Sequence, residues 1–171
     1  MRAKMKELYG LYIEDDINNV IVQQARFDLF DGIHIKGLDK LPEKIEDFYP
    51  IIVRDHIDFL IIDHELDKQM VSYKGSDALT EIRKCDSTIY AILLTNYTLE
   101  DYKEELGAYD YQLTKKEMAE PGKIDEVVQK IRRACELRCD NKVLAEMELR
   151  HKEKEALINE LKSYTFAEKK G

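Results

Sequence analysis

Five short apolar runs recur along the chain before Lys115, and amphipathic segments separate them. The runs cover residues 8–13, 33–38, 57–63, 89–95 and 109–114. Apolar runs of this length that are rich in β-branched and aromatic residues predict β-strands, and runs without alternation predict strands that are buried on both faces. The pattern therefore predicts five strands, most of them in the interior of a sheet.

The segments between the runs space their apolar residues as a helix does, so each strand is followed by a helix. We expect helices at 17–30, 41–56, 76–85, 98–107 and 123–164. Ser76 and Thr98 are expected N-caps, and Pro50 is expected to bend or break the second helix. Strict strand–helix alternation predicts the α/β class: a five-stranded, doubly wound parallel sheet with helices on both faces, plus a long C-terminal helix.

Polar side chains stand where these apolar runs end. They are Glu14, Asp15, Asp16, Asp63, Thr95 and Lys115. In open parallel sheets, ligands bind outside the carboxyl ends of the strands, at the point where the strand order reverses. If the first and third strands are neighbours, the acidic residues converge at this edge.

Carboxylates that are packed together have raised pKa values unless a cation neutralises them. A hard dication such as Mg²⁺ takes oxygen ligands and keeps several of its waters. We therefore expect a Mg²⁺ site at Glu14, Asp15 and Asp63. Two plainer interpretations remain open: the acids are solvated loop residues, or Asp63 starts a turn or caps a helix.

Four short motifs close these strands in order: YIEDD at 12–16, LIIDHEL at 60–66, ILLTN at 92–96 and GAYDYQLTK at 107–115. With these motifs the chain resembles the response-regulator receiver domains of two-component signalling, over roughly residues 5–135. The resemblance implies that Asp63 accepts a phosphoryl group from a histidine kinase or phosphotransfer protein. It further implies that this Mg²⁺-dependent change is relayed to an output partner or to the C-terminal helix.

The resemblance also assigns roles to single residues. Glu14 and Asp15 match the acidic pair that binds the metal with Asp63, and the backbone carbonyl of Glu65 matches a further ligand. Apart from self-catalysed phosphoryl uptake and hydrolysis, it implies no enzymatic activity.

Thr95 matches the switch hydroxyl and Lys115 the invariant lysine, but their surroundings depart from the family pattern. Lys116 stands where a proline usually follows the lysine. The segment after Gly107 is also longer than usual by about one residue, so Lys116 is an alternative for the lysine role. Gln112 replaces the usual aromatic residue, and Asn96 replaces a small residue after the threonine. These departures concern switching and phosphodonor access more than metal binding.

Two other functions remain open. One is a pseudo-receiver, which keeps the fold as a phosphorylation-independent protein-interaction module; Asn96 and Gln112 favour it. The other is an aspartate-based phosphatase of the haloacid dehalogenase type. That chemistry requires a second aspartate two residues after the nucleophile, and Glu65 stands there instead.

Charge and cysteine content limit the classes of partner and the cellular compartment that we expect. The net charge is −8, and residues 1–120 carry 15 Lys and Arg against 25 Asp and Glu, which argues against direct nucleic-acid binding by that part. No run is long enough to span a membrane. Three sparse cysteines predict a reducing cytoplasm rather than a disulfide framework. Cys135 and Cys139 are spaced to share a metal, but no matching ligand pair is nearby.

The long C-terminal helix exceeds what a receiver domain needs. We expect a receiver domain at 1–135, a helical extension at 136–164 and a tail at 165–171. Apolar residues of the extension approximate a three/four spacing that is interrupted by polar residues. The extension is therefore interpreted as a dimerising coiled coil, which would make the protein a homodimer, or as a linker to an output partner. A helix that folds back and a solvated extension remain open.

Overall fold

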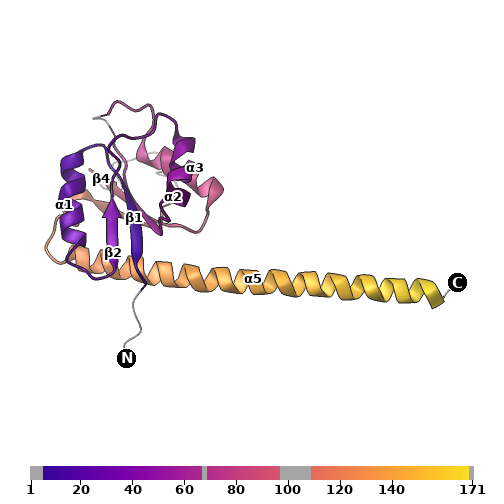
Figure 1. Ribbon diagram of the computed structural model, residues 1–171. Coiled ribbons are helices and arrows are strands. Elements are labelled where there is room, and N and C mark those ends of the chain that lie inside the picture. The colour runs from indigo at the N-terminus through magenta and orange to yellow at the C-terminus, as the bar shows by residue number, and fades with distance from the viewer. Residues whose placement is uncertain (1–5, 67–68, 97–108, 170–171) are drawn as a thin grey trace. The chain divides into compact units, whose positions relative to one another are not determined.

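The computed structural model describes residues 6–66, 69–96 and 109–169 (Figure 1). The chain divides into two compact units, Met1–Cys135 and Glu136–Gly171. The helix expected at 98–107 and its N-cap Thr98 lie outside the described residues.

One parallel sheet of five strands forms the centre of the first unit (Figure 1). Its strands are β1 (Leu8–Ile13), β2 (Ile33–Lys36), β3 (Phe59–Asp63), β4 (Tyr90–Thr95) and β5 (Tyr111–Thr114). The order is β2-β1-β3-β4-β5. β2 is added on one side of β1 and β3 on the other, so the strand order reverses between β1 and β3. The five-stranded, doubly wound prediction is confirmed, and β1 and β3 are neighbours as the convergence of the acids requires.

The helices cover both faces of this sheet. They are α1 (Ile17–Phe27), a 3₁₀ turn (Ile45–Asp47), α2 (Phe48–Arg54), α3 (Gly75–Cys85), α4 (Lys115–Met118) and α5 (Lys123–Lys169). Strand side chains alternate between the two faces. Leu60 and Ile62 pack with α2 and α3. Phe59 and Ile61 pack with α1 and the first turns of α5.

Two predicted helix starts are wrong. The segment at 41–56 turns helical only at Ile45, and α2 continues unbroken through Pro50. Pro50 lies in the first turn of α2, where a backbone N–H has no intrahelical partner to lose.

α3 begins at Gly75 rather than at an N-cap Ser76. The Asp77 carboxylate accepts a hydrogen bond from the Lys74 backbone N–H at 2.8 Å, one residue before the helix. A Cβ on Gly75 would lie 2.0 Å from the Asp63 carbonyl oxygen, so only glycine allows α3 to start against the end of β3.

α5 is 47 residues long and runs past the expected end at Tyr164 to Lys169, since the sequence from Lys123 to Lys169 contains no glycine or proline. Its first turns bury Ile124, Val127, Val128 and Ile131. In contrast, every side chain described at 148–163 is exposed. Among the described residues, no helix is both long and apolar enough to cross a membrane.

Candidate functional site

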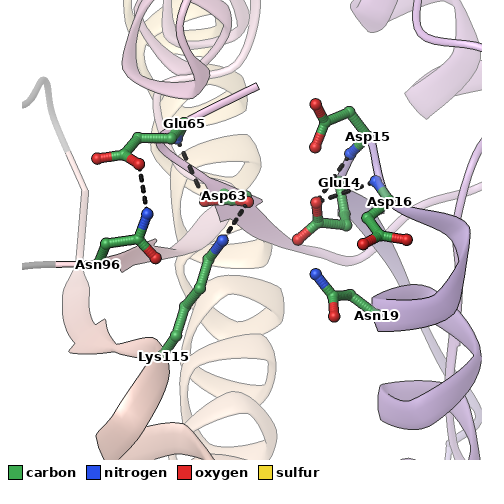
Figure 2. A pocket seen from close by; sticks show the side chains of 8 residues that line it. All are labelled: Glu14, Asp15, Asp16, Asn19, Asp63, Glu65, Asn96 and Lys115. Atoms are coloured by element: carbon green, nitrogen blue, oxygen red, sulfur yellow. Dashed lines mark hydrogen bonds and ion pairs between the residues drawn. The ribbon is translucent and has the colours of Figure 1, made fainter. Parts of the chain in front are cut away.

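Three acidic side chains converge at the carboxyl ends of β1 and β3 (Figure 2). The parallel register pairs Ile13 with Ile62, which brings the residues that follow each to the same level. One carboxylate oxygen each of Glu14, Asp15 and Asp63 lies within 4.8 Å of the others. Their exposed fractions are 2%, 8% and 1%, so all three acidic residues are buried.

This convergence shifts the pKa of two of the acids. Burial, followed by interactions with the Asp15 and Asp63 side chains, raises the pKa of Glu14 to about 8. Burial also raises the pKa of Asp63, although Lys115 and Glu14 oppose that shift. Because a nearby opposite charge lowers the pKa of a carboxyl group, the cluster favours a bound cation.

Local hydrogen bonds hold the acidic pair in place. One oxygen of Glu14 accepts from the backbone N–H groups of Asp15 and Asp16, at 3.0 and 3.1 Å. Asp16 itself caps α1, where its side chain accepts from the Asn18 backbone N–H at 3.0 Å. Asp15 and Glu14 therefore face the cluster while Asp16 has a structural role.

Gln69 also holds Asp15, and sequence reasoning missed it. Its backbone N–H donates to an Asp15 carboxylate oxygen at 3.3 Å, and its side-chain amide donates to the Asp15 carbonyl at 3.2 Å. Gln69 also accepts from the Leu41 backbone N–H at 2.9 Å. The long loop after Asp63 thus reaches the acidic pair; the only sequence signal for this is the unusual length of that loop.

Lys115 supplies a cation beside Asp63 (Figure 2). Its Nζ lies 2.8 Å from Asp63 Oδ2. Thr114 caps α4 by accepting from the Glu117 backbone N–H at 3.0 Å, and this fixes Lys115 as the first helical residue. Burial opposes the charged form of Lys115, but its pKa is nevertheless raised by Asp63, Glu14 and Glu65. Lys116 is exposed and does not line the site.

Two contacts complete the surroundings of Asp63. Its Oδ1 accepts from the Glu65 backbone N–H at 3.2 Å. The Glu65 carboxylate in turn accepts a hydrogen bond from the side-chain amide of Asn96.

Thr95 is fully buried at the end of β4. Its hydroxyl oxygen accepts from the Gln112 side-chain amide at 3.3 Å. The other amide atom of Gln112, its carbonyl oxygen, is buried and has no hydrogen-bond partner among the described residues. Gln112, which stands where the receiver pattern has an aromatic residue, therefore contacts Thr95.

The acids and the lysine line one cavity of about 170 Å³. Its lining residues are Glu14, Asp15, Asp16, Asn19, Asp63, Glu65, Asn96 and Lys115. Three clustered carboxylates are the oxygen ligands that Mg²⁺ prefers, so the residues present fit this ion. A cavity with a cation site on one side and Lys115 on the other suits a small phosphorylated group.

No protein-family model matches the sequence. No curated protein matches it either. Solved structures do match.

One similar structure is the response regulator TrrA of Thermotoga maritima in complex with Mg²⁺–BeF, at 22% identity and TM-score 0.55, covering 74% of this chain and 99% of that one. The receiver domain of a Francisella response regulator matches at 20% identity and TM-score 0.56, covering 76% and 98%.

A third similar structure is the receiver domain of a sensor histidine kinase from Pseudomonas aeruginosa, with a magnesium ion coordinated in its active-site cleft. It matches at 20% identity and TM-score 0.57, covering 75% of this chain and 98% of that one. At these identities the likeness concerns the fold. With its strand order and the helices on both faces of its sheet, the chain has the fold of the response-regulator receiver domains.

Proposed function

We propose that the protein is a phosphoacceptor receiver domain in which Asp63 takes a phosphoryl group from a histidine kinase or phosphotransfer protein. The protein would act in the cytoplasm. One observation carries the proposal. The buried Asp63 carboxylate lies between Lys115, at 2.8 Å, and the acids Glu14 and Asp15. A carboxylate that is held rigidly between a cation and a metal site is arranged for nucleophilic attack on phosphorus.

The metal ligands would be the side chains of Glu14, Asp15 and Asp63 and the backbone carbonyl of Glu65. When bound, Mg²⁺ neutralises negative charge on the acids and on the phosphoryl oxygens. An Asp63 oxygen forms the new bond to phosphorus while the bond from phosphorus to the donor breaks, and the donor keeps that electron pair. The Glu65 backbone N–H holds the other Asp63 oxygen, at 3.2 Å.

Lys115 and Thr95 would respond to the new phosphoryl group. Lys115 is a compact charge on a flexible stem, so it can move from the Asp63 carboxylate to a phosphoryl oxygen. Thr95 would donate its hydroxyl to another phosphoryl oxygen and draw away from Gln112. That movement would change the surface near β4 and β5, and an output partner or the C-terminal helix would read the change.

A pseudo-receiver is the second candidate, because the Asn96–Glu65 hydrogen bond borders the cavity and Gln112 replaces an aromatic ring. Both functions allow Mg²⁺ binding, but they differ in whether Asp63 becomes phosphorylated. A receiver takes up phosphate, whereas a pseudo-receiver binds Mg²⁺ and remains unmodified.

Intact mass after incubation with acetyl phosphate and Mg²⁺ separates the two. We expect the mass to rise by one phosphoryl group, with no rise when a chelator removes Mg²⁺. Asp63→Asn should show no rise. An unchanged mass with every donor, despite Mg²⁺ binding, contradicts the phosphoacceptor function and favours the pseudo-receiver.

A further inference from the structure

Asp15 is held by a residue that lies 54 positions further along the chain and outside the cavity. The Gln69 backbone N–H donates to Asp15 Oδ2, and the Gln69 side-chain amide donates to the Asp15 carbonyl, at 3.3 and 3.2 Å. Gln69 is not among the residues that line the cavity. It is therefore placed to orient the Asp15 carboxylate rather than to coordinate an ion.

The same amide group joins Asp15 to a second loop. The Gln69 side-chain carbonyl accepts from the backbone N–H of Leu41, which lies between β2 and α2, at 2.9 Å. One side chain thus bridges the acidic pair and the loop that follows β2.

A further hydrogen bond joins the loop at 69–74 to the loop that follows β2, and it does not involve Asp15. The Tyr73 hydroxyl donates to the Pro42 carbonyl at 2.5 Å. The Tyr73 ring also packs edge-on against Phe48 of α2, with the ring centroids 5.7 Å apart. The loop at 69–74 is therefore fixed to α2, and Gln69 connects it to the acidic pair.

The backbone next to Gln69 indicates that these hydrogen bonds hold the loop in shape. Met70 has a φ of 54°, in the left-handed region that residues with a Cβ rarely adopt. Its side chain is 90% exposed, so packing of that side chain contributes little to this conformation. The contacts of Gln69 and Tyr73 on either side hold the strained turn in place.

We propose that Gln69 is a positioning residue for the metal site: it orients Asp15 for a divalent cation and couples occupancy of the site to the two loops. The proposal rests on the Mg²⁺ site of the proposed function and not on phosphoryl transfer.

The expected effect on metal affinity follows from the crowding of the acids. The carboxylates of Glu14, Asp15 and Asp63 repel one another in a buried cluster, so Asp15 would turn away if nothing held it. Loss of a residue that orients a metal ligand typically costs about 10- to 100-fold in affinity. Because the hydrogen bonds from Gln69 to Asp15 are long, we expect the lower end, about tenfold.

The coupling to the loops must be reciprocal. If the Gln69 contact raises Mg²⁺ affinity about tenfold, saturating Mg²⁺ favours the formed contact by the same factor. The Leu41 backbone N–H, which is bonded to the Gln69 side chain, is then expected to exchange with solvent about tenfold more slowly when Mg²⁺ is bound.

Amide hydrogen exchange of the wild-type chain, followed by NMR with and without saturating Mg²⁺, tests the coupling. The Tyr9 backbone N–H is the matched control, since it also donates to a side chain, that of Asp58, but near the amino end of β1. Stabilisation of the whole fold by Mg²⁺ slows both amides equally, whereas the coupling slows Leu41 more. Equal slowing overturns the coupling.

Calorimetric titration with Mg²⁺ tests the positioning role. Gln69→Met keeps the length of the side chain but removes its polar atoms, and it is expected to weaken Mg²⁺ binding about tenfold. Gln69→Asn is one methylene too short to span both partners and should weaken binding to a similar extent, which covers the case in which Gln69→Met does not fold. Tyr73→Phe is the matched control, because it removes the other hydrogen bond between the loops and leaves Asp15 untouched.

Tyr73→Phe should lower the melting temperature in chelator as Gln69→Met does, but it should keep the wild-type dissociation constant for Mg²⁺. An unchanged dissociation constant in the folded Gln69 variants, or an equal loss in Tyr73→Phe, overturns the positioning role. No Mg²⁺ binding by the wild type overturns this inference together with the Mg²⁺-dependent function. Mg²⁺ binding without any mass increase from acetyl phosphate contradicts the phosphoacceptor function alone.

Discussion

Lys115 Nζ and Asp63 Oδ2 lie 2.8 Å apart, although Asp63 ends β3, Lys115 follows β5, and β4 lies between these two strands. The long lysine stem crosses the end of β4 and brings its charge to a carboxylate that is 1% exposed. Because the side chain of Lys115 is about one-third exposed, the pair is formed at the cavity surface and can exchange partners.

Lys115→Ala is expected to remove the response to phosphate while costing only about 1 kcal/mol of unfolding free energy, because a partly exposed ion pair contributes little. The response is measured by amide hydrogen exchange with and without acetyl phosphate. Lys116→Ala, which alters an exposed neighbour, should keep the response. If Lys116→Ala abolishes the response and Lys115→Ala does not, the assignment of the lysine is wrong.

Asp63→Asn is expected to raise the melting temperature of the Mg²⁺-free protein. The amide is nearly isosteric, and it removes a buried charge that burial disfavours and that adds to the repulsion at Glu14. The gain should be about 1 kcal/mol, or a few degrees, because the loss of the Lys115 ion pair offsets part of it. Thermal unfolding in chelator checks this, and a lowered melting temperature contradicts it.

Asp15→Ala is expected to abolish stabilisation by Mg²⁺. Binding to the folded state alone raises the unfolding free energy by about 1.4 kcal/mol when the ion is at ten times its dissociation constant. Asp16→Ala is the control: it removes the cap of α1 and costs about 1 kcal/mol, but it should keep the Mg²⁺-induced shift. Melting curves of both variants with and without millimolar Mg²⁺ test this prediction, and a Mg²⁺-induced shift that persists in Asp15→Ala contradicts it.

The stability of the Mg²⁺-free protein is expected to fall as pH rises toward 8. Folded Glu14 holds its proton up to a pKa of about 8, whereas in the unfolded chain it ionises near 4.5. Between these values the folded state binds more protons, so Glu14 contributes a loss of up to about 1.4 kcal/mol per pH unit as pH rises.

Glu14→Gln should flatten the pH profile in that window, and urea unfolding at several pH values measures it. Mg²⁺ binding should strengthen over the same range, because the metal requires the ionised carboxylate. A profile that is equally steep in Glu14→Gln assigns the pH dependence to another group.

The exposed apolar side chains of the second unit predict self-association. Leu149, Leu157, Ile158 and Leu161 are all more than 40% exposed. An isolated helix is marginal in water, and packing these residues against a second copy would stabilise it. Sedimentation should give a dimer for the full chain and a monomer for a chain that ends at Cys135. If the full chain is monomeric at high concentration, the coiled-coil interpretation is wrong and the linker interpretation remains.

Much of the fold follows from local sequence pattern. The five apolar runs became the five strands, with ends shifted by at most two residues, because burial on both faces demands apolar side chains at successive positions. Glu14 and Asp63 could be placed at strand ends for the same reason. Their convergence followed once parallel strands were expected, since their carboxyl ends meet at one edge.

The tertiary structure decided what local pattern could not. Lys115 and Lys116 are adjacent and chemically alike, and about 100° of rotation along a helix separates their directions. The Gly75 start of α3 depends on the carbonyl of Asp63, and the hold of Gln69 on Asp15 spans 54 positions. Contacts between residues far apart in sequence leave no periodic trace, so only the folded chain reveals them.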